Sequence, residues 1–297
     1  MTISEEQMNR WAKAPSETEE VKCQNAVNRI TTAIRKEFGD SVSIMLQGSY
    51  KNRTNVKLDS DVDIVVLHTD YFFPDLGNLS DSDKSTYHSI YKGSDYTFAQ
   101  FKNDIQRLLQ DEFDYGEIER KNKCIRVKEN SYRVNADVVP CFAHRRYRSL
   151  DGIEAEGVAF ISDDSSRVYS FPEHHYENGV NKNKETEQMY KAIVRILKNV
   201  RNDLAEKNII TLDNMPSFYL ECLVWNVLSE HFDSNRYHDA TRNVIATIWN
   251  DMREIEKSNN YAEVSDLKWL FRGNSKITPK QAEDFMQYAW NYIGYEN

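Results

Sequence analysis

The chain has 297 residues, of which 40% are hydrophobic and 29% are charged, and its formal net charge is -9 at pH 7. This length is enough for one large core or for two closely packed domains. The acidic balance argues against a surface that grips long nucleic acid through many phosphate contacts. A local basic patch and metal ions can still bind a small anionic substrate.

The N-terminal residues are acidic and polar, and they lack the order of a signal peptide. No apolar run approaches the length of a membrane helix. We therefore expect a cytoplasmic protein that does not bind membranes.

Cysteine spacing supports neither a disulfide framework nor a structural zinc site, because the four cysteines are far apart and include no C-x-x-C pair. Cys141 and His144 are close in sequence. Without a second ligand pair, we expect a buried thiol beside a surface histidine there.

The first half of the chain alternates between helical and strand patterns. Apolar residues at helical spacing predict a long amphipathic helix over Glu19–Phe38. Residues 70–97 are rich in polar residues and are predicted to be an excursion from the sheet, followed by a helix over Thr97–Gln110. Short apolar runs predict strands at Ser43–Leu46, Val62–Leu67, Cys124–Val127, Tyr132–Phe142, Gly157–Ile161 and Arg167–Ser170.

Beyond residue 185 the pattern becomes helical. The predicted helices are 185–206, 216–232, 237–257 and 279–293. The last of these follows Thr278-Pro279, a typical cap and first-turn proline. The sequence therefore predicts an α+β fold, with a mixed-sheet core over 1–184, a helical lobe over 185–297 and a cleft between them.

Two carboxylates alternate with apolar residues at the start of the second predicted strand. Because successive side chains point to opposite faces, Asp61 and Asp63 project together, away from Val62. Neighbouring carboxylates repel unless a cation compensates, and hard oxygen ligands favour Mg²⁺, with Mn²⁺ as a substitute. Asp59 is a rival, but the apolar run after Asp61 favours the 61 and 63 pair and leaves Asp59 as a loop residue.

A third carboxylate lies in the predicted strand Tyr132–Phe142. Alternation buries Ala136 and Val138 and turns Asp137 to the other face. Three carboxylates on neighbouring strands are what two-metal phosphoryl transfer requires. We expect Asp61 and Asp63 to hold both metal ions, and Asp137 to complete the site that activates the attacking hydroxyl.

The first predicted strand leads into Gly48-Ser49, with Gln47 directly before the turn. Glycine lets the backbone approach a phosphate closely, and the serine hydroxyl and nearby amides can donate hydrogen bonds to it. Together with Asp61 and Asp63, this turn predicts a nucleotide site that includes Gln47, Gly48 and Ser49.

A stripe of Lys191, Arg195, Lys198 and Asn202 runs along the helix predicted at 185–206, opposite its apolar face. Such a stripe is commonly a solvated surface. Facing a cleft with three carboxylates, it would instead bind a triphosphate.

A second helix start follows at Pro216-Ser217, where free amides and the Ser217 hydroxyl form an anion site. Phe218 or Tyr219 could stack on a base, although an aromatic residue there is more commonly part of a core. Glu221 is expected to brace neighbouring structure.

These residues resemble the CD-NTases, bacterial relatives of cyclic GMP-AMP synthase and oligoadenylate synthase in the polymerase-beta-like nucleotidyltransferase superfamily. The resemblance covers most of the chain and rests on Gly48-Ser49, Asp61-Val62-Asp63, Asp137, Lys198 and the block 216–221. Residues 178–183 are most similar to the CdnE branch.

The resemblance implies a synthase of cyclic di- or trinucleotides for antiphage (CBASS) signalling, which uses ATP, UTP or GTP with two Mg²⁺ ions. It further implies that Lys198 and Ser217 contact the donor triphosphate and that Phe218 stacks on its base. An asparagine of the cleft lid favours pyrimidines in the CdnE branch, and both Asn178 and Asn181 are candidates. A separate effector would respond to the product.

We also expect a monomer. Stable DNA binding is not expected, because no Cys/His cluster matches the zinc-bearing insertion of the animal DNA sensor. Two alternatives stay open. The enzyme could transfer a nucleotide to a small molecule, a protein or an RNA end, because the acceptor is not chosen by the catalytic strands. An inactive nucleotide-binding regulator is disfavoured by the presence of all three carboxylates.

Overall fold

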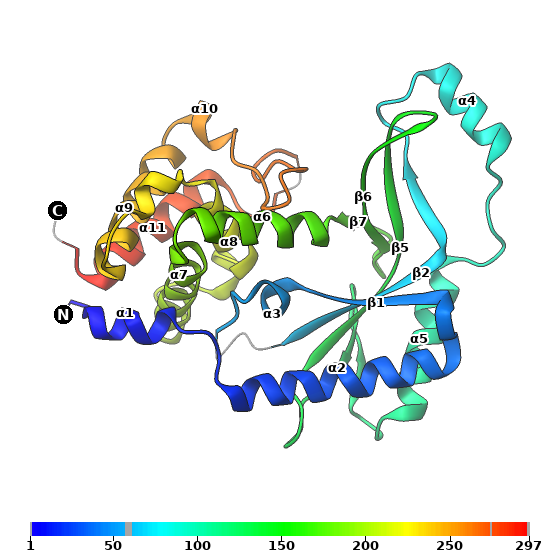
Figure 1. Ribbon diagram of the computed structural model, residues 1–297, viewed down its shortest axis with the longest axis horizontal. Coiled ribbons are helices and arrows are strands. Elements are labelled where there is room, and N and C mark those ends of the chain that lie inside the picture. The colour runs from blue at the N-terminus through cyan, green and yellow to red at the C-terminus, as the bar shows by residue number, and fades with distance from the viewer. Residues whose placement is uncertain (1, 57–60, 274, 296–297) are drawn as a thin grey trace. The chain divides into compact units, whose positions relative to one another are not determined.

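The computed structural model describes residues 2–56, 61–273 and 275–295 (Figure 1). Two compact units divide the chain, and each contains segments that are far apart in sequence. The helical unit contains Met1–Pro15, Lys51–Asp59 and Glu173–Asn297, and the sheet unit contains Ser16–Tyr50 and Ser60–Pro172. The α+β class predicted from the sequence is confirmed.

Within the described residues, the sheet unit is built on 7 strands in the order β1-β2-β5-β4-β3, with β6 between β5 and β7. The strands are β1 (Val42–Gln47), β2 (Val62–Asp75), β3 (Ile118–Arg120), β4 (Ile125–Val127), β5 (Ala136–Ser149), β6 (Gly152–Ile161) and β7 (Arg167–Ser170). β2 and β5 are parallel, and the other neighbouring pairs are antiparallel. The parallel pair matters because it aligns the starts of two central strands.

Helices α2 (Glu17–Phe38) and α5 (Phe98–Glu112) pack against each other on one face of this sheet (Figure 1). Capping boxes start both of them, so their first amide groups are satisfied. Their apolar faces, including Ile30 and Phe101, are fully buried in one core with the strand residue Ile64. Each such burial contributes about 1.5–3 kcal/mol, which fixes the sheet against the helices.

The remaining elements of this part of the chain are short: η1 (Gly39–Ser41), α3 (Gly48–Asn52) and α4 (Asp81–Ile90). The predicted excursion over 70–97 is wrong at its start, because β2 continues to Asp75 and stays paired with β5. A register shift between His68 and Phe72 allows this continuation, and Tyr71 and Phe73 pack their rings against Phe142.

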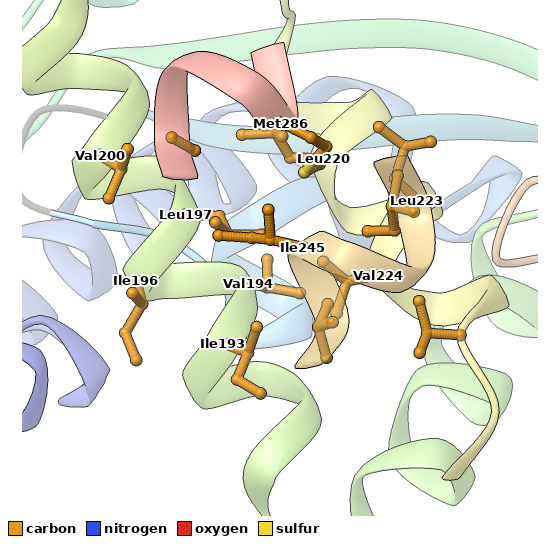
Figure 2. Packing of buried hydrophobic residues seen from close by; sticks show 14 of the residues in the cluster. Ile193, Val194, Ile196, Leu197, Val200, Leu220, Leu223, Val224, Ile245 and Met286 are labelled. Carbon is orange, nitrogen blue, oxygen red and sulfur yellow. The ribbon is translucent and has the colours of Figure 1, made fainter. Parts of the chain in front are cut away.

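The helical unit surrounds a second core, centred on α7. Its helices are α1 (Glu5–Ala12), α6 (Pro172–Glu185), α7 (Met189–Glu206), η2 (Leu212–Asn214), α8 (Ser217–Asn226), η3 (Ser229–Phe232), α9 (Tyr237–Met252), α10 (Ile255–Ser258) and α11 (Pro279–Ile293). Figure 2 shows Ile193 and Leu197 of α7 among buried side chains of α8, α9 and α11. α7 is therefore buried along most of its length.

Two of the helices predicted in this unit are confirmed, and two are shorter than expected. α7 and α11 match 185–206 and 279–293, whereas 216–232 divides into α8 and η3, and 237–257 divides into α9 and α10. α1 and α6 were not predicted. The last segment of the helical unit begins at Glu173 and includes most of α6, whereas the sequence predicted domain limits of 1–184 and 185–297.

One side-chain prediction on β5 is wrong. Cys141 is buried as expected, but His144 is also buried, with 2% of its surface exposed, and stacks on Tyr169. In the part of the chain that the structure describes, no helix is long and apolar enough to cross a membrane.

Candidate active site

A row of polar side chains crosses the sheet at the start of its parallel pair. Gln47 of β1 is the strand partner of Asp63 of β2, Asp63 is the partner of Asp137 of β5, and Asp137 is the partner of Arg126 of β4. Partners in neighbouring strands point to the same face. The row therefore lies on the face opposite to the buried side chain of Val62.

Asp61 joins this row from just before β2. Its Oδ1 accepts a hydrogen bond of 3.3 Å from Asn135 Nδ2, and its Oδ2 accepts one of 2.8 Å from Arg126 Nη2. The backbone supports this position, because Val62 N donates to Asn135 O at 3.0 Å. The structure thus brings Asp61, Asp63 and Asp137 to one face, as predicted. Asp59, the rival, lies outside the described residues.

Arg126 is the residue of this site that the sequence analysis missed. Its Nε donates to Asp137 Oδ1 at 2.8 Å, and its Nη2 donates to Asp137 Oδ2 at 2.9 Å as well as to Asp61. The hydrogen bonds to Asp137 and the charges of both carboxylates raise the pKa of the Arg126 guanidinium, although burial opposes them. Arg126 therefore stays charged and ties two of the three carboxylates together.

Gly48 shows why the turn after β1 needs glycine. Its φ of +69° is in the region that L side chains rarely adopt, and a Cβ built at this position would collide with Asp63 Oδ2. Gly48 also begins the short helix α3, which contains Ser49. Because Gly48 has no side chain, the Asp63 carboxylate can lie against the backbone of this turn.

The oxygen donors of this row are the type that Mg²⁺ and Mn²⁺ prefer. The guanidinium between Asp61 and Asp137 shows that a positive charge fits between them. Among the described residues, however, no group of three His, Cys, Asp or Glu side chains is already arranged to hold a metal ion. The three aspartates fit a metal site by ligand type and by face, and the metal site itself remains a prediction.

A second polar cluster lies inside the helical unit, around the carboxylate of Glu221 on α8. Thr54 Oγ1 donates to Glu221 Oε2 at 2.9 Å, and His175 Nε2 lies 3.0 Å from Glu221 Oε1. Glu221 is 4% exposed, and Lys198 of α7 is 1% exposed. Burial opposes ionisation, yet His175, Lys198 and the Thr54 hydroxyl lower the pKa of Glu221 to about 2. Glu221 braces its neighbours, as predicted.

The basic stripe of α7 is not a solvated surface, so that interpretation is wrong. Its members Lys191, Lys198 and Asn202 are buried, and Arg195 donates to the carbonyl oxygens of Ala12 and Arg53. Burial lowers the pKa of Lys191, and it lowers that of Arg195 to about 10. Residues of this stripe therefore make structural contacts within the helical unit, and a role in binding a triphosphate would be additional to these contacts.

The predicted helix start at Ser217 is confirmed, because α8 begins there after Pro216. Phe218, directly after it, is 41% exposed, and its ring centroid lies 6.0 Å from that of His175. The Tyr219 hydroxyl instead accepts a hydrogen bond of 2.8 Å from Lys276 N. Of the two aromatic candidates, Phe218 is the one with an accessible ring.

Asn178 and Asn181 both lie within α6 and line one cavity of the helical unit, together with Trp225. Asn178 Nδ2 donates to Val264 O at 2.9 Å, whereas Asn181 is exposed. The two asparagines therefore share a cavity, and the Asn178 side chain is held by a hydrogen bond to the backbone of another segment.

Known proteins are similar to this chain over its helical half and over its whole length. The family model for the cGAS/DncV-like nucleotidyltransferase C-terminal helical domain matches residues 177–294. Over 296 residues, 100% of both chains, the sequence is 46% identical to a cyclic dipurine nucleotide synthase of Elizabethkingia meningoseptica. It is 35% identical to the cyclic dipyrimidine nucleotide synthase CdnE of Cecembia lonarensis, with 98% of each chain covered.

Solved structures give the same result. A CdnE cyclic dinucleotide synthase of Elizabethkingia meningoseptica, solved with GTP and Apcpp, superposes with a TM-score of 0.85 at 44% identity and covers 99% of this chain and 100% of that one. A CdnE c-UMP-AMP synthase of Rhodothermus marinus, solved with Apcpp and Upnpp, superposes with a TM-score of 0.83 at 30% identity and 99% coverage of both chains.

Proposed function

Because the chain belongs to the CD-NTase family of cGAS/DncV-like nucleotidyltransferases, we propose that it joins two nucleoside triphosphates into a cyclic dinucleotide. In each of two transfers, a ribose hydroxyl oxygen bonds to the α-phosphorus of a nucleotide, and pyrophosphate leaves. The observation that carries the proposal is the row of Asp63 and Asp137, with Asp61 beside it, on one face of the sheet.

We assign Asp61, Asp63 and Asp137 as the ligands of two Mg²⁺ ions, for which Mn²⁺ can substitute. When bound, the ions neutralise charge on the triphosphate and activate the attacking hydroxyl. The chain contributes the placement of these carboxylates. Gly48 leaves space for Asp63, and Asn135 and Arg126 orient Asp61 and Asp137.

Nucleotide contacts are assigned to two sets of residues, at the end of β1 and on the helices α7 and α8. β1 ends at Gln47, the strand partner of Asp63, and Gly48 and Ser49 begin the helix α3 directly after it. This position supports a role of the three residues in binding phosphate oxygens. We propose that Lys198 and Ser217 contact the donor triphosphate. Buried Lys198 lowers the pKa of Glu221 through its charge, which supports a fixed position for the lysine, and the helix start at Ser217 supports anion binding.

Base recognition is assigned to Phe218, Asn178 and Asn181. The exposed ring of Phe218 supports stacking on the donor base. Asn181 is the better candidate for a base contact, because Asn178 already donates to Val264 O. Purine substrates are favoured, because the relative at 46% identity is named a dipurine synthase and two relatives at 35% are named dipyrimidine synthases.

The wider role in this proposal is antiphage signalling, in which a separate effector protein responds to the cyclic product. The enzyme would act as a cytoplasmic monomer. Deleting the gene for the effector while keeping the synthase should abolish protection without changing the amount of product in infected cells.

The activity itself is tested by incubating purified protein with Mg²⁺ and all four NTPs, treating with phosphatase, and identifying the surviving product by mass spectrometry. A phosphatase-resistant cyclic dinucleotide, mainly of purines, is the expected product. Label from an α-labelled NTP on an added small molecule, protein or RNA would instead establish transfer to a separate acceptor.

N181A should change the ratio of bases in the product more than N178A does.

A further inference from the structure

The Arg126 guanidinium stands where oxygens of two different carboxylates converge. Its Nη2 lies 2.8 Å from Asp61 Oδ2 and 2.9 Å from Asp137 Oδ2, while Nε holds Asp137 Oδ1 at 2.8 Å. One nitrogen thus bridges two of the proposed metal ligands. The strand register produces this geometry, because Arg126 and Asp137 are direct partners on β4 and β5.

These contacts are partly shielded from solvent. The side chain of Arg126 is 23% exposed, that of Asp137 is 19% exposed and that of Asp61 is 42% exposed. Hydrogen bonds between ionised groups are stronger than neutral ones, and partial burial reduces their screening. A guanidinium cannot lose its charge in this setting. A cation that approaches the same oxygens therefore meets a fixed positive charge.

We propose that Arg126 is a positioning residue that orients Asp137 and competes with divalent cations for the oxygens of Asp61 and Asp137. This inference rests on the proposed function, because it takes the aspartates as metal ligands. A divalent ion binds carboxylate oxygens at about 2.0–2.1 Å for Mg²⁺, closer than the guanidinium does. Nη2 must release at least one of its two oxygens, while the bond from Nε can keep Asp137 in place.

Two effects of opposite sign follow for R126Q. Removal of the competing charge should tighten cation binding by about tenfold, the equivalent of one charge-assisted hydrogen bond. Loss of the bidentate contact should leave Asp137 less well oriented, so that turnover falls even at saturating cation. A residue that only stabilised the fold would weaken both properties together.

The test is a titration with Mn²⁺ alone, in which free Mn²⁺ is counted by electron paramagnetic resonance. Wild type, R126Q and D63N are compared with R120Q as the matched control. Arg120 is on β3, the strand next to β4, and it makes a similar two-point contact with Asp163. Its Nε donates to Asp163 Oδ2 at 2.9 Å, and its Nη2 donates to Asp163 Oδ1 at 2.8 Å. Thermal midpoints with EDTA and with Mn²⁺ provide a second readout, because at one ligand concentration a ligand that binds the folded state more tightly stabilises it more.

The expected result is a tenfold lower Kd for R126Q, a larger Mn²⁺-induced rise in its thermal midpoint, and wild-type binding by R120Q. An unchanged or weaker affinity in R126Q overturns the role of Arg126 while leaving the metal site intact, provided that D63N loses binding. Equal binding by wild type and D63N overturns the metal site, and with it this inference. R126K, which keeps the charge but loses the two-point fork, should bind Mn²⁺ with intermediate affinity, and this comparison decides the question if R126Q does not fold.

Discussion

The polar clusters of the two units are opposites in charge and in exposure. In the sheet unit, several carboxylates surround one guanidinium, and the side chain of Asp61 is 42% exposed. In the helical unit, basic side chains surround one carboxylate, and Glu221 is 4% exposed. Carboxylates that are accessible to solvent and outnumber the basic side chains near them attract cations from solution. A buried acid with its partners in place supports the fold around it.

This difference supports the proposal that the carboxylates of the sheet unit serve catalysis and that the Glu221 cluster stabilises the fold. A buried ion pair costs desolvation and is retained only with good partners, so its loss mainly destabilises the protein. In contrast, neighbouring carboxylates in the sheet unit repel one another, so they lower the stability of the fold while providing ligands for a cation. Substitutions in the two clusters should therefore change different observables, and the following predictions test this.

The largest expected effect is on catalysis. D63N should lower the rate of cyclic product formation at least about 10³-fold, because the metal ions contribute several kcal/mol to transition-state stabilisation. Its thermal midpoint should stay the same or rise, since one repelling charge is removed. D81N at an exposed position of α4 is the control and should keep wild-type activity. A D63N enzyme with wild-type turnover would show that the chemistry lies elsewhere.

In the helical unit, E221Q should destabilise the protein by about 3 kcal/mol, because it removes the buried negative charge that faces His175 and Lys198. Urea unfolding followed by circular dichroism measures this change. E230Q, at a side chain that is 76% exposed, should change the free energy of unfolding by less than about 0.5 kcal/mol. Equal stability of E221Q and E230Q would contradict the supporting role of Glu221.

G48A sharpens the comparison by disturbing the carboxylate row through its backbone support. The positive φ should cost about 1–2 kcal/mol of stability, and the collision with Asp63 should lower activity further. G116A is the matched control, since Gly116 has a φ of +86° with nothing within 4 Å of an added Cβ. Both variants should lose stability, measured by thermal unfolding, but G48A alone should lose activity. A similar loss of activity in both would remove the specific role of Gly48.

The last expected effect, and the smallest one near neutral pH, is a pH dependence of stability. The pKa of Glu221 is lowered from 4.5 to about 2 in the folded protein, so its stabilisation is complete above pH 4.5 and is lost as pH falls toward 2. The difference in unfolding free energy between wild type and E221Q should be constant from pH 7 to 5 and should narrow below pH 4.5. A difference that narrows already between pH 7 and 6 would contradict this assignment.

Elements with local signals could be predicted from the sequence. Helical spacing was sufficient to predict α2 and α5, Thr278-Pro279 marked the start of α11, and alternation placed Asp61, Asp63 and Asp137 on one face. The end of β2 was missed because a register shift lets polar and aromatic residues continue the strand. Such a shift has no periodic signature.

Contacts between distant segments could not be predicted. The partnership of Arg126 with Asp137 depends on the register in which β4 pairs with β5, and neither strand shows this register by itself. Lys198 is buried on α7, and Glu221, whose pKa it lowers, comes from another helix. A basic stripe with unknown neighbours was therefore interpreted as a solvated or ligand-binding surface.

The most direct test of the account is the rate of pyrophosphate release by D137N, measured at saturating Mg²⁺ and NTP beside wild type. Asp137 is the strand partner of both Asp63 on β2 and Arg126 on β4, so the proposed centre depends on it. We predict a rate at least about 10³-fold below wild type, at a thermal midpoint within a few degrees. Release at the wild-type rate by folded D137N would contradict the assignment of this row as the catalytic centre.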